Sequence, residues 1–272
     1  RDSIIAIILG IVEGFTEYLP VSSTGHMILV GDMLGFTGPR ASVFEIFIQL
    51  GAILSVVIIY KEKFTRMPIS IAAGPPAAEE LVPNDTGLTL AHIAAGIIRS
   101  WASAISRITP SRPISSRPER SSSASSSGGL FMLMAEKHGT KTVCDDVEKM
   151  TVAQAFLTGI FQILALWPGF SRSGSTIAGG VLSLSRKAAA DFSFIIAVPV
   201  MIVACFYDLL KSLSDLSSND LIMIVIGFIT AFIVAYVSVL WFLKFMNKST
   251  LASFAYYRFI IAAISFIYFF IF

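Results

Sequence analysis

Residues 10–26 read GIVEGFTEYLPVSSTGH, and residues 159–175 read GIFQILALWPGFSRSGS. With an offset of 149 positions the two stretches superimpose, and each places proline, glycine and hydroxyl side chains between two short apolar runs. The matching pairs include Gly10 and Gly159, Ile11 and Ile160, Ser22 and Ser171, and Gly25 and Gly174. Helices that are interrupted at matching places in two halves of a membrane protein indicate a binding site near the middle of the bilayer.

The composition is that of a membrane protein. Of the 272 residues, 55% are hydrophobic and 14% are charged, and the mean hydropathy is +0.77, whereas soluble domains carry about 25% charged residues. Residues 221–243 contain no charged side chain and could form a helix that crosses ~30 Å of hydrocarbon. We therefore predict an all-α polytopic membrane protein.

The sequence carries weaker signals for a nucleic-acid partner, for disulfide bonds and for a signal peptide. No polybasic tract suits nucleic acid outside an unusual arginine-rich segment, so no nucleic-acid partner is expected. Cys144 lies in a polar stretch and Cys205 in an apolar one, which predicts free thiols rather than a disulfide framework. The first residues lack a basic region followed by a cleavage site, and no signal peptide is expected there.

Basic residues predict the topology, because they mark the cytoplasmic ends of spans. They flank apolar segments at Lys61, Lys63 and Arg66, at Arg186 and Lys187, and at Lys244 and Lys248, whereas the loop 208–220 is mainly acidic and is expected outside. These assignments agree only if the broken pairs 4–34 and 152–184 are re-entrant, the first entering from outside and the second from inside. Backbone of this kind is tolerated only where protein buries it or water reaches it.

The predicted fold is an inverted-topology repeat with six transmembrane helices plus two re-entrant helix pairs. It forms a single integral membrane domain, 1–272, with the first repeat in 1–135, the second in 151–272, and both termini outside. The remaining apolar segments are 43–60, 87–98, 130–135, 192–207, 221–243 and 254–272.

Residues 99–127 are anomalous within this pattern. They contain five arginines and twelve serines but no lysine, and five arginines cannot lie in lipid cheaply. One interpretation is a disordered Ser/Arg linker; the preferred one is a helix-coding stretch translated out of frame, with the apolar frame resuming at residue 128. No function is assigned to this segment.

Glu13 and Glu17 are the first candidate site residues. Their spacing of four puts both on one helix face, and carboxylates in an apolar segment are costly and usually functional. Alternatively, each caps a neighbouring helix or pairs with a buried arginine. Two carboxylates would repel a phosphate unless a divalent cation lies between them, so Mg²⁺ or Ca²⁺ is expected at Glu13 and Glu17.

Hydroxyl clusters open the second helix of each broken pair. Such residues often cap helices, but a helix N-terminus also binds anions through free N–H groups and its dipole. If the two repeats oppose each other, both N-termini could hold phosphate groups. The expected phosphate-binding residues are Ser22, Thr24, Ser171, Ser173, Gly174 and Thr176.

Arg172 and His26 complete the candidate set. A guanidinium can hold phosphate oxygens through two parallel hydrogen bonds; the alternative is a structural salt bridge with Glu13 or Glu17. His26 lies one turn past Ser22 and Ser23 and could be a general acid for a leaving phosphate, or else a hydrogen-bonded core residue.

Other polar residues in apolar segments carry weaker signals. Glu45 and Gln49, four residues apart, are expected to face the same cavity, and Gln162 occupies the repeat position of Glu13. Arg258 is expected to snorkel to the membrane interface. The aromatic residues expected to anchor the protein at the interface include Trp167, Trp241, Tyr256 and Tyr257.

The motifs at residues 13–26 and 168–176 resemble the two signatures of bacterial undecaprenyl-pyrophosphate phosphatases of the bacitracin-resistance type. The resemblance extends over 4–60, 87–98 and 130–272. It implies hydrolysis of a C55 polyprenyl diphosphate, which recycles the lipid carrier of peptidoglycan synthesis and supports cell-wall biogenesis, cell shape and resistance to bacitracin. It also implies a bacterial inner-membrane location, an active site facing the periplasm and a divalent cation. A homodimer is a separate expectation that does not rest on these motifs.

Carried over by motif position, the resemblance gives Glu17, Ser23, His26 and Arg172 as the catalytic group, with Glu13 in support. Ser23 would attack the terminal phosphorus after losing its proton to a carboxylate or to His26, or a metal-bound water would attack instead. The alternative function is a flippase that transports polyprenyl phosphate, since inverted repeats with broken helices are also a transporter architecture.

Overall fold

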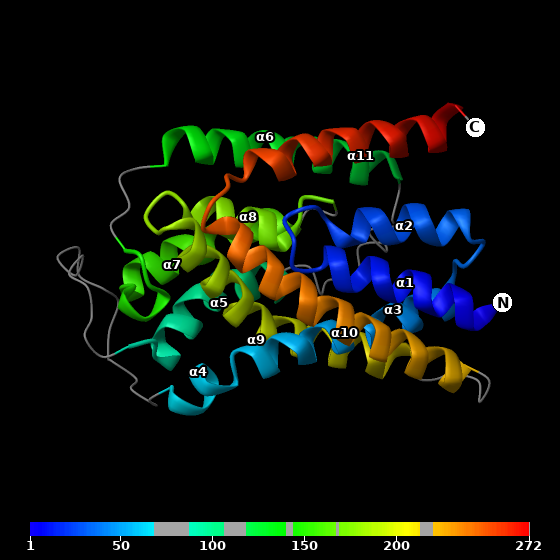
Figure 1. Ribbon diagram of the computed structural model, residues 1–272, viewed down its shortest axis with the longest axis horizontal. Helices are drawn as coiled ribbons and strands as arrows, with labels where there is room; N and C mark the ends of the chain where they lie inside the picture. The colour runs from blue at the N-terminus through cyan, green and yellow to red at the C-terminus, as the bar shows by residue number, and fades with distance from the viewer. Residues whose placement is uncertain (68–86, 106–117, 140–143, 167–168, 213–219, 272) are drawn as a thin grey trace.

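The computed structural model describes residues 1–67, 87–105, 118–139, 144–166, 169–212 and 220–271 (Figure 1). These residues form helices and connecting loops and contain no strand. The helices are α1 (Asp2–Thr16), α2 (Ser23–Met33), α3 (Pro39–Ile59), α4 (Lys61–Arg66), α5 (Leu90–Ile105), α6 (Pro118–His138), α7 (Val152–Phe161), α8 (Arg172–Gly180), α9 (Arg186–Ser212), α10 (Asp220–Met246) and α11 (Ala252–Ile271), with 3-10 turns η1 (Val147–Lys149) and η2 (Gln162–Leu166).

Four helices in the described part of the chain are long and apolar enough to cross a membrane: α3, α9, α10 and α11. This number agrees with a multi-pass membrane protein. Helices α5 and α6 lie where the other two expected spans fall, but α5 has only 16 residues and the first half of α6 is rich in serine.

Two helical hairpins correspond to the two broken segments. Helix α1 ends at Thr16, the chain turns, and α2 returns beside α1, so this hairpin has its open end near the N-terminus (Figure 1). Helices α7 and α8 form the second hairpin at the opposite end of the molecule. Trp167 and Pro168, between η2 and α8, lie outside the described residues.

The two hairpins have the same unusual backbone at equivalent positions. Ser22 caps α2 with φ 71°, and Ser171 caps α8 with φ 75°; within the described ranges they are the only residues other than glycine with positive φ. Each Oγ accepts a hydrogen bond from the glycine N–H three residues later, at 3.4 Å from Gly25 and 3.2 Å from Gly174. A positive φ costs an L-residue about 1–2 kcal/mol, so the same strain recurs in both halves.

The hairpins meet at their tips. Ser173, in the first turn of α8, donates a hydrogen bond from its Oγ to the carbonyl oxygen of Leu19 at 2.8 Å. Both residues are buried. This contact joins residues 154 positions apart and places the N-terminus of α8 beside the turn that leads into α2.

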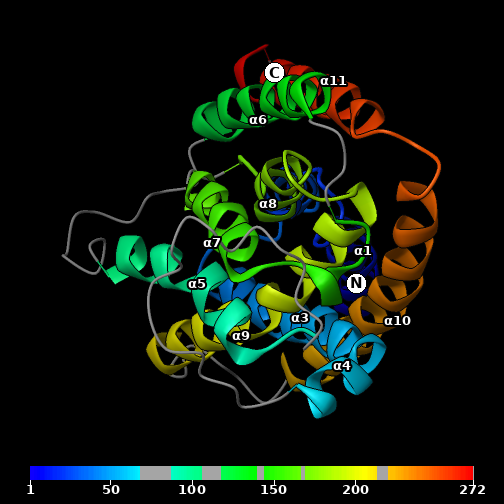
Figure 2. The ribbon, with the colours of Figure 1, turned by 90° about the vertical axis from the view of Figure 1, so that its left-hand side faces the viewer.

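Glycines allow α1 to pack very closely on α10. A Cβ atom on Gly10 would lie 2.8 Å from the carbonyl oxygen of Gly227, and one on Gly14 would lie 2.6 Å from that of Ala231. Small residues at helix contacts are typical of membrane proteins, where van der Waals packing holds helices together. On another side of the bundle, α6 and α11 form a pair, and α8 lies against α6 and α9 (Figure 2).

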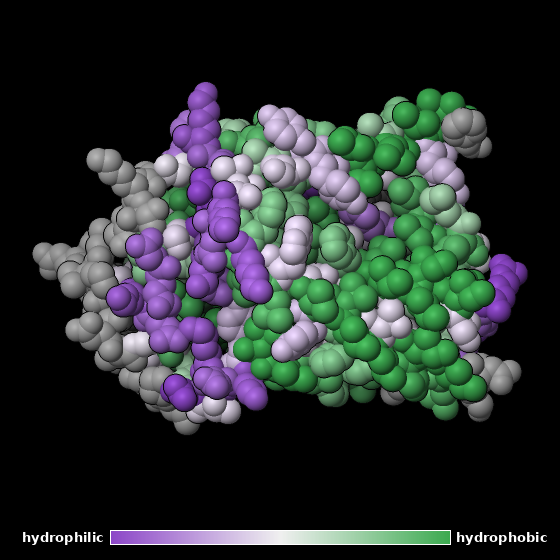
Figure 3. All heavy atoms as spheres, in the orientation of Figure 1, coloured by the Kyte–Doolittle hydropathy of each residue, from purple (hydrophilic) through white to green (hydrophobic). Residues whose placement is uncertain are grey.

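The two ends of the molecule carry charged residues, and a largely hydrophobic face lies between them. Both termini lie at one end and α4 lies at the other (Figure 1). Hydrophilic residues gather in a band near α4, and hydrophobic residues cover much of the face between that band and the end with the termini (Figure 3). At the terminal end Arg40 pairs with Asp2 at 2.8 Å and with Asp220 at 2.6 Å, which ties α1, α3 and α10 together.

The two cysteines are free, as expected. Cys144 donates its Sγ hydrogen bond to the carbonyl oxygen of Asp146 at 3.0 Å, and burial raises the pKa of its thiol. Cys205 donates to Gln49 Oε1 at 3.2 Å.

The alternative interpretation of residues 99–127 as a disordered linker is wrong for the part that the structure describes. Helix α5 continues to Ile105, and α6 already begins at Pro118, so the serine run 121–127 is helical. Packing of α6 along α11 provides a partner for this segment, because tertiary contacts can override weak helix propensity. The rest of the segment, 106–117, lies outside the described residues.

Candidate active site

Glu17 connects the two hairpins. Its Oε2 accepts a hydrogen bond from Ser23 Oγ at 2.5 Å, and its Oε1 accepts one from Arg172 Nη2 at 3.1 Å. The Glu17 and Arg172 side chains are only 7% and 15% exposed. A hydroxyl, a carboxylate and a guanidinium from two distant segments thus form one hydrogen-bonded line at the hairpin tips.

The local fold explains why Glu17 reaches both partners. Its backbone N–H still donates to the carbonyl of Glu13 at 2.9 Å, so Glu17 continues the last turn of α1. Ser23 begins α2 directly after the strained cap at Ser22, which turns the chain back toward Glu17. Ser23 is half-buried, so its hydroxyl is not sealed inside the protein.

Glu13 lies one turn before Glu17 and is 5% exposed. Its carboxyl lies within electrostatic range of Glu17, Glu45 and Arg172. Four charged groups therefore gather around the tip of α1, and Arg172 is the cation among them.

Arg172 is held by the first hairpin as well as by its own. Its guanidinium carbon lies 5.6 Å from the centre of the Tyr18 ring, a distance typical of a cation–π contact. Tyr18 is fully buried and packs edge-on against Phe194 of α9 at 5.3 Å. This role of Tyr18 was not predicted, although its place beside Glu17 in the first motif was a usable signal.

The hydroxyl residues of the second hairpin have different tasks. Ser171 caps α8, and its Oγ lies 3.2 Å from that of Ser173. Ser173 donates to Leu19, and Thr176 donates to the carbonyl oxygen of Arg172 at 2.9 Å while fully buried. Thr176 is therefore turned toward its own helix, which speaks against direct phosphate binding by its hydroxyl.

A cavity of about 360 Å³ opens beside Ser23. Its wall combines the first hairpin with α3 and the end of α9, and Thr24 is exposed toward it. The prediction that Glu45 and Gln49 face the same cavity is confirmed. The lining residues are Glu13, Ser23, Thr24, Met27, Ser42, Glu45, Ile46, Gln49 and Asp208.

His26 takes a different direction from Ser23. Its Nδ1 lies 2.8 Å from the carbonyl oxygen of Ser22, and its Nε2 lies 2.9 Å from the hydroxyl of Tyr257 in α11. Both ring nitrogens therefore have partners, and neither partner is Ser23. Glu17, rather than His26, is the group positioned to take a proton from the Ser23 hydroxyl.

The expectation that Arg258 snorkels to the interface is wrong. Arg258 is 0% exposed and donates to the carbonyl oxygens of Ser125 at 3.0 Å and Gly169 at 2.9 Å. Gly128 makes this possible, since a Cβ there would lie 2.3 Å from Arg258 Nη2. The guanidinium does not need to reach the membrane interface, because backbone carbonyls of α6 and of the second hairpin accept its hydrogen bonds inside the protein.

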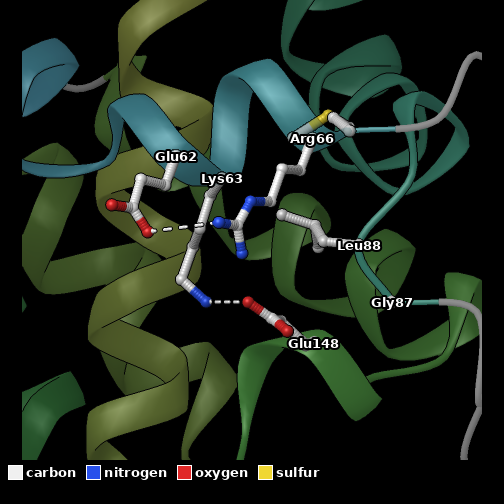
Figure 4. Close-up of a pocket in the computed structure, with 7 residues that line it drawn as sticks. Glu62, Lys63, Arg66, Gly87, Leu88 and Glu148 are labelled. Atoms are coloured by element: carbon white, nitrogen blue, oxygen red, sulfur yellow. Dashed lines mark hydrogen bonds and ion pairs between the residues drawn. The ribbon is translucent and has the colours of Figure 1, made fainter.

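A second hollow lies at the end of the molecule that holds α4 (Figure 4). Its volume is about 460 Å³, and its charged residues already pair with one another. Lys63 contacts Glu148, and Arg66 lies 4.0 Å from Glu62. None of the candidate catalytic residues lines it, so the cavity beside Ser23 is the better candidate for a substrate site.

Comparison with known families agrees with the motifs. The family model described as bacitracin resistance protein BacA matches residues 6–264, which include both hairpins. The chain belongs to this family. BacA proteins form the undecaprenyl-pyrophosphate phosphatase family, and the resemblance stated from the two signatures is confirmed.

The tip of α1 offers carboxyl groups of the kind that bind a divalent cation. Among the described residues no three His, Cys, Asp or Glu side chains form a ready-made metal cluster. Glu13 and Glu17 supply two adjacent carboxylates, and Mg²⁺ is commonly bound by one or two carboxylates together with substrate phosphates.

Proposed function

We propose that the protein hydrolyses undecaprenyl diphosphate to undecaprenyl monophosphate and inorganic phosphate. The observation that carries this proposal is the contact of Glu17 with both Ser23 and Arg172. A nucleophile, an adjacent base and a phosphate-binding cation are the parts that phosphoryl transfer through a serine requires.

In this proposal the diphosphate enters the cavity beside Ser23 head first. Arg172 exchanges part of its contact with Glu17 for phosphate oxygens, and N–H groups at the starts of α2 and α8 supply further donors. Thr24 lines the cavity. Ser22, Ser171, Ser173 and Gly174 would provide further phosphate contacts where the two hairpin tips meet. Thr176 is left out, because its hydroxyl is engaged within α8.

The chemical step starts at Ser23. Its Oγ attacks the terminal phosphorus while its proton passes to Glu17 Oε2, and the bond between phosphorus and the bridging oxygen breaks. Undecaprenyl monophosphate leaves, and Ser23 carries the phosphoryl group. Glu17 then releases the Ser23 proton to solvent. Water attacks that phosphorus with Glu17 as the base, the phosphorus–Oγ bond breaks as Glu17 returns the new proton to Oγ, and inorganic phosphate departs. His26 supplies the proton that the leaving phosphate needs.

Glu13 and Glu17 would hold a divalent cation, Mg²⁺ or Ca²⁺. When bound, it would neutralise phosphoryl oxygens that two carboxylates would otherwise repel. The residues of the chain keep their separate tasks: Arg172 orients the phosphate, and the low exposure of Glu17 keeps bulk water away from its contact with Ser23.

The proposed membrane arrangement follows from the same geometry. Both hairpins are re-entrant, α5 and α6 join α3, α9, α10 and α11 as six spans, and the polyprenyl chain lies between spans. The cavity beside Ser23 then opens toward the end that holds both termini, which faces the periplasm of a bacterial inner membrane.

The experiment is phosphate release from undecaprenyl diphosphate by detergent-purified protein. We expect release that stops with chelator and returns with Mg²⁺ or Ca²⁺, and a loss of about 10²-fold or more in Ser23→Ala. Ser42→Ala is the matched control, because Ser42 lines the same cavity but donates to Gly38. An acid quench that traps phosphate on Ser23 would support the covalent route.

Three outcomes would contradict the proposal in different ways. Ser23→Ala that keeps most activity would remove the covalent step and leave direct attack by water. Release unaffected by chelator would remove the cation. No release in detergent by a folded protein that moves polyprenyl phosphate between leaflets of vesicles would favour the flippase instead.

A further inference from the structure

The two imidazole nitrogens of His26 contact a backbone carbonyl oxygen and a tyrosine hydroxyl. A carbonyl oxygen only accepts hydrogen bonds, so the contact with Ser22 at 2.8 Å requires a proton on Nδ1. In the neutral ring Nε2 is then the acceptor, and the hydroxyl of Tyr257 donates to it across 2.9 Å. The Ser22 carbonyl thus selects the Nδ1–H tautomer, and the Tyr257 hydroxyl provides the donor for Nε2.

Tyr257 also orients the plane of the ring. The two rings are parallel to within 3°, with centroids 5.7 Å apart. Tyr257 belongs to α11 and His26 to α2, so this contact joins the first hairpin to a helix 231 positions away. The next residue, Arg258, donates to the carbonyl oxygen of Gly169 beside the second hairpin. This bond fixes the turn of α11 that carries Tyr257.

The exposed fractions of His26 and Tyr257 differ strongly. His26 is 7% exposed, whereas Tyr257 is 40% exposed. A proton that leaves or reaches Nε2 therefore meets the Tyr257 hydroxyl first. From the sequence Tyr257 was expected to be an interface anchor, whereas its hydroxyl contacts a candidate catalytic residue.

We propose that Tyr257 is a positioning residue for His26: its hydroxyl orients the imidazole through Nε2 and carries proton exchange between Nε2 and the surroundings. The inference rests on the proposed function, in which His26 supplies a proton to the leaving phosphate. When Nε2 is protonated, Nε2–H donates to Tyr257 Oη and the hydroxyl proton turns outward. Two transfers, from Nε2 to Oη and from Oη to a phosphate or water oxygen, move one proton out and leave the tyrosine unchanged.

The test starts with Tyr257→Phe, which keeps the stacked ring and removes only the hydroxyl. We expect kcat for phosphate release to fall about tenfold with KM changed less than about twofold, since one hydrogen bond to the catalytic group is lost. Tyr256→Phe is the matched control: Tyr256 is the neighbouring residue, 61% exposed, and its variant should keep the wild-type kcat.

A double-mutant cycle separates a role through His26 from a general structural role. If Tyr257 acts through His26, Tyr257→Phe should cost nothing further in a His26→Gln background. An equal loss of kcat in both backgrounds would overturn the proposal, as would an unchanged kcat in Tyr257→Phe alone.

A readout without substrate keeps the inference distinct from the proposed function. Nitrogen NMR of labelled His26 in nanodiscs should show a preference for the Nδ1–H tautomer with a hydrogen-bonded Nε2 in the wild type. In Tyr257→Phe the Ser22 carbonyl keeps that tautomer, and the Nε2 resonance should move to that of a free acceptor. A wild-type spectrum without that preference would overturn the inference whatever the activity. Absent hydrolysis of undecaprenyl diphosphate together with the expected spectra would instead count against the proposed function alone.

Discussion

Substitutions in the ion pair between Glu17 and Arg172 can distinguish a catalytic role of the pair from a purely structural one. Glu17→Gln and Arg172→Gln each keep much of the side-chain shape and remove one charge, and the double variant removes both. If the pair serves catalysis, folded variants lose turnover; if it is only a structural salt bridge, they lose stability and keep their turnover per folded molecule.

The expected coupling follows from the geometry. At 3.1 Å and an effective dielectric constant of about 20, two unit charges attract by about 5 kcal/mol. Because the side chains are only 7% and 15% exposed, lost hydration offsets much of this attraction. We expect a coupling free energy of about 1.5–3 kcal/mol, the range for a hydrogen bond between charged groups.

The assay combines unfolding of detergent-purified protein with phosphate release from undecaprenyl diphosphate. Each single variant should lower kcat/KM by about 10²-fold or more, because Glu17 is the proposed base and Arg172 the proposed phosphate ligand. The control cycle uses Glu62→Gln and Arg66→Gln, a pair 4.0 Å apart with side chains 73% and 81% exposed. Its coupling should stay below about 0.5 kcal/mol.

Two results would refute the reasoning. A coupling between Glu17 and Arg172 no larger than that of the control pair would mean that the contact contributes nothing as a pair. Single variants that unfold more easily but release phosphate at the wild-type rate would make the pair a structural salt bridge, and the proposed catalytic roles would fall.

Three further substitutions test how the hairpins are held. Ser173→Ala removes the hydrogen bond to Leu19 that joins the tips and should lower the free energy of unfolding by about 1 kcal/mol; an unchanged melting temperature would show that the tips do not depend on it. Ser171→Gly relieves the positive φ of 75° and loses little as a cap, so stability should rise by about 1 kcal/mol while KM increases; a lower melting temperature would contradict the strain argument. Gly14→Ala would place a Cβ 2.6 Å from the Ala231 carbonyl oxygen and should destabilise the protein by about 1–3 kcal/mol, measured by thermal unfolding; wild-type stability would mean that α1 and α10 separate at no cost.

The hairpin tips were predictable because their signals are local. The matched Pro, Gly and Ser positions predicted two interrupted helices, and the structure gives Ser22 and Ser171 the same strained cap. Opposed hairpins also predicted that Glu17 and Arg172 would approach each other, and they form an ion pair. Motif spacing was sufficient here, because each tip is built by a few consecutive residues.

The surroundings of the tips were not predictable in the same way. The contact of His26 with Tyr257 spans 231 positions, and no local pattern encodes it. Arg258 near the start of an apolar helix has the pattern of a snorkelling residue, yet it binds carbonyls supplied by α6 and the second hairpin. Such burial depends on neighbours that only the assembled fold brings close.

The equivalence of Ser22 and Ser171 shows how differently the two hairpins are equipped. Counting on from those caps, Ser23 in one hairpin corresponds to Arg172 in the other, and Glu13 corresponds to Gln162. Two copies of the first hairpin would place carboxylates opposite carboxylates, without Arg172 between them. The site therefore requires the hairpins to differ, because Glu17 and Ser23 come from one and Arg172 comes from the other.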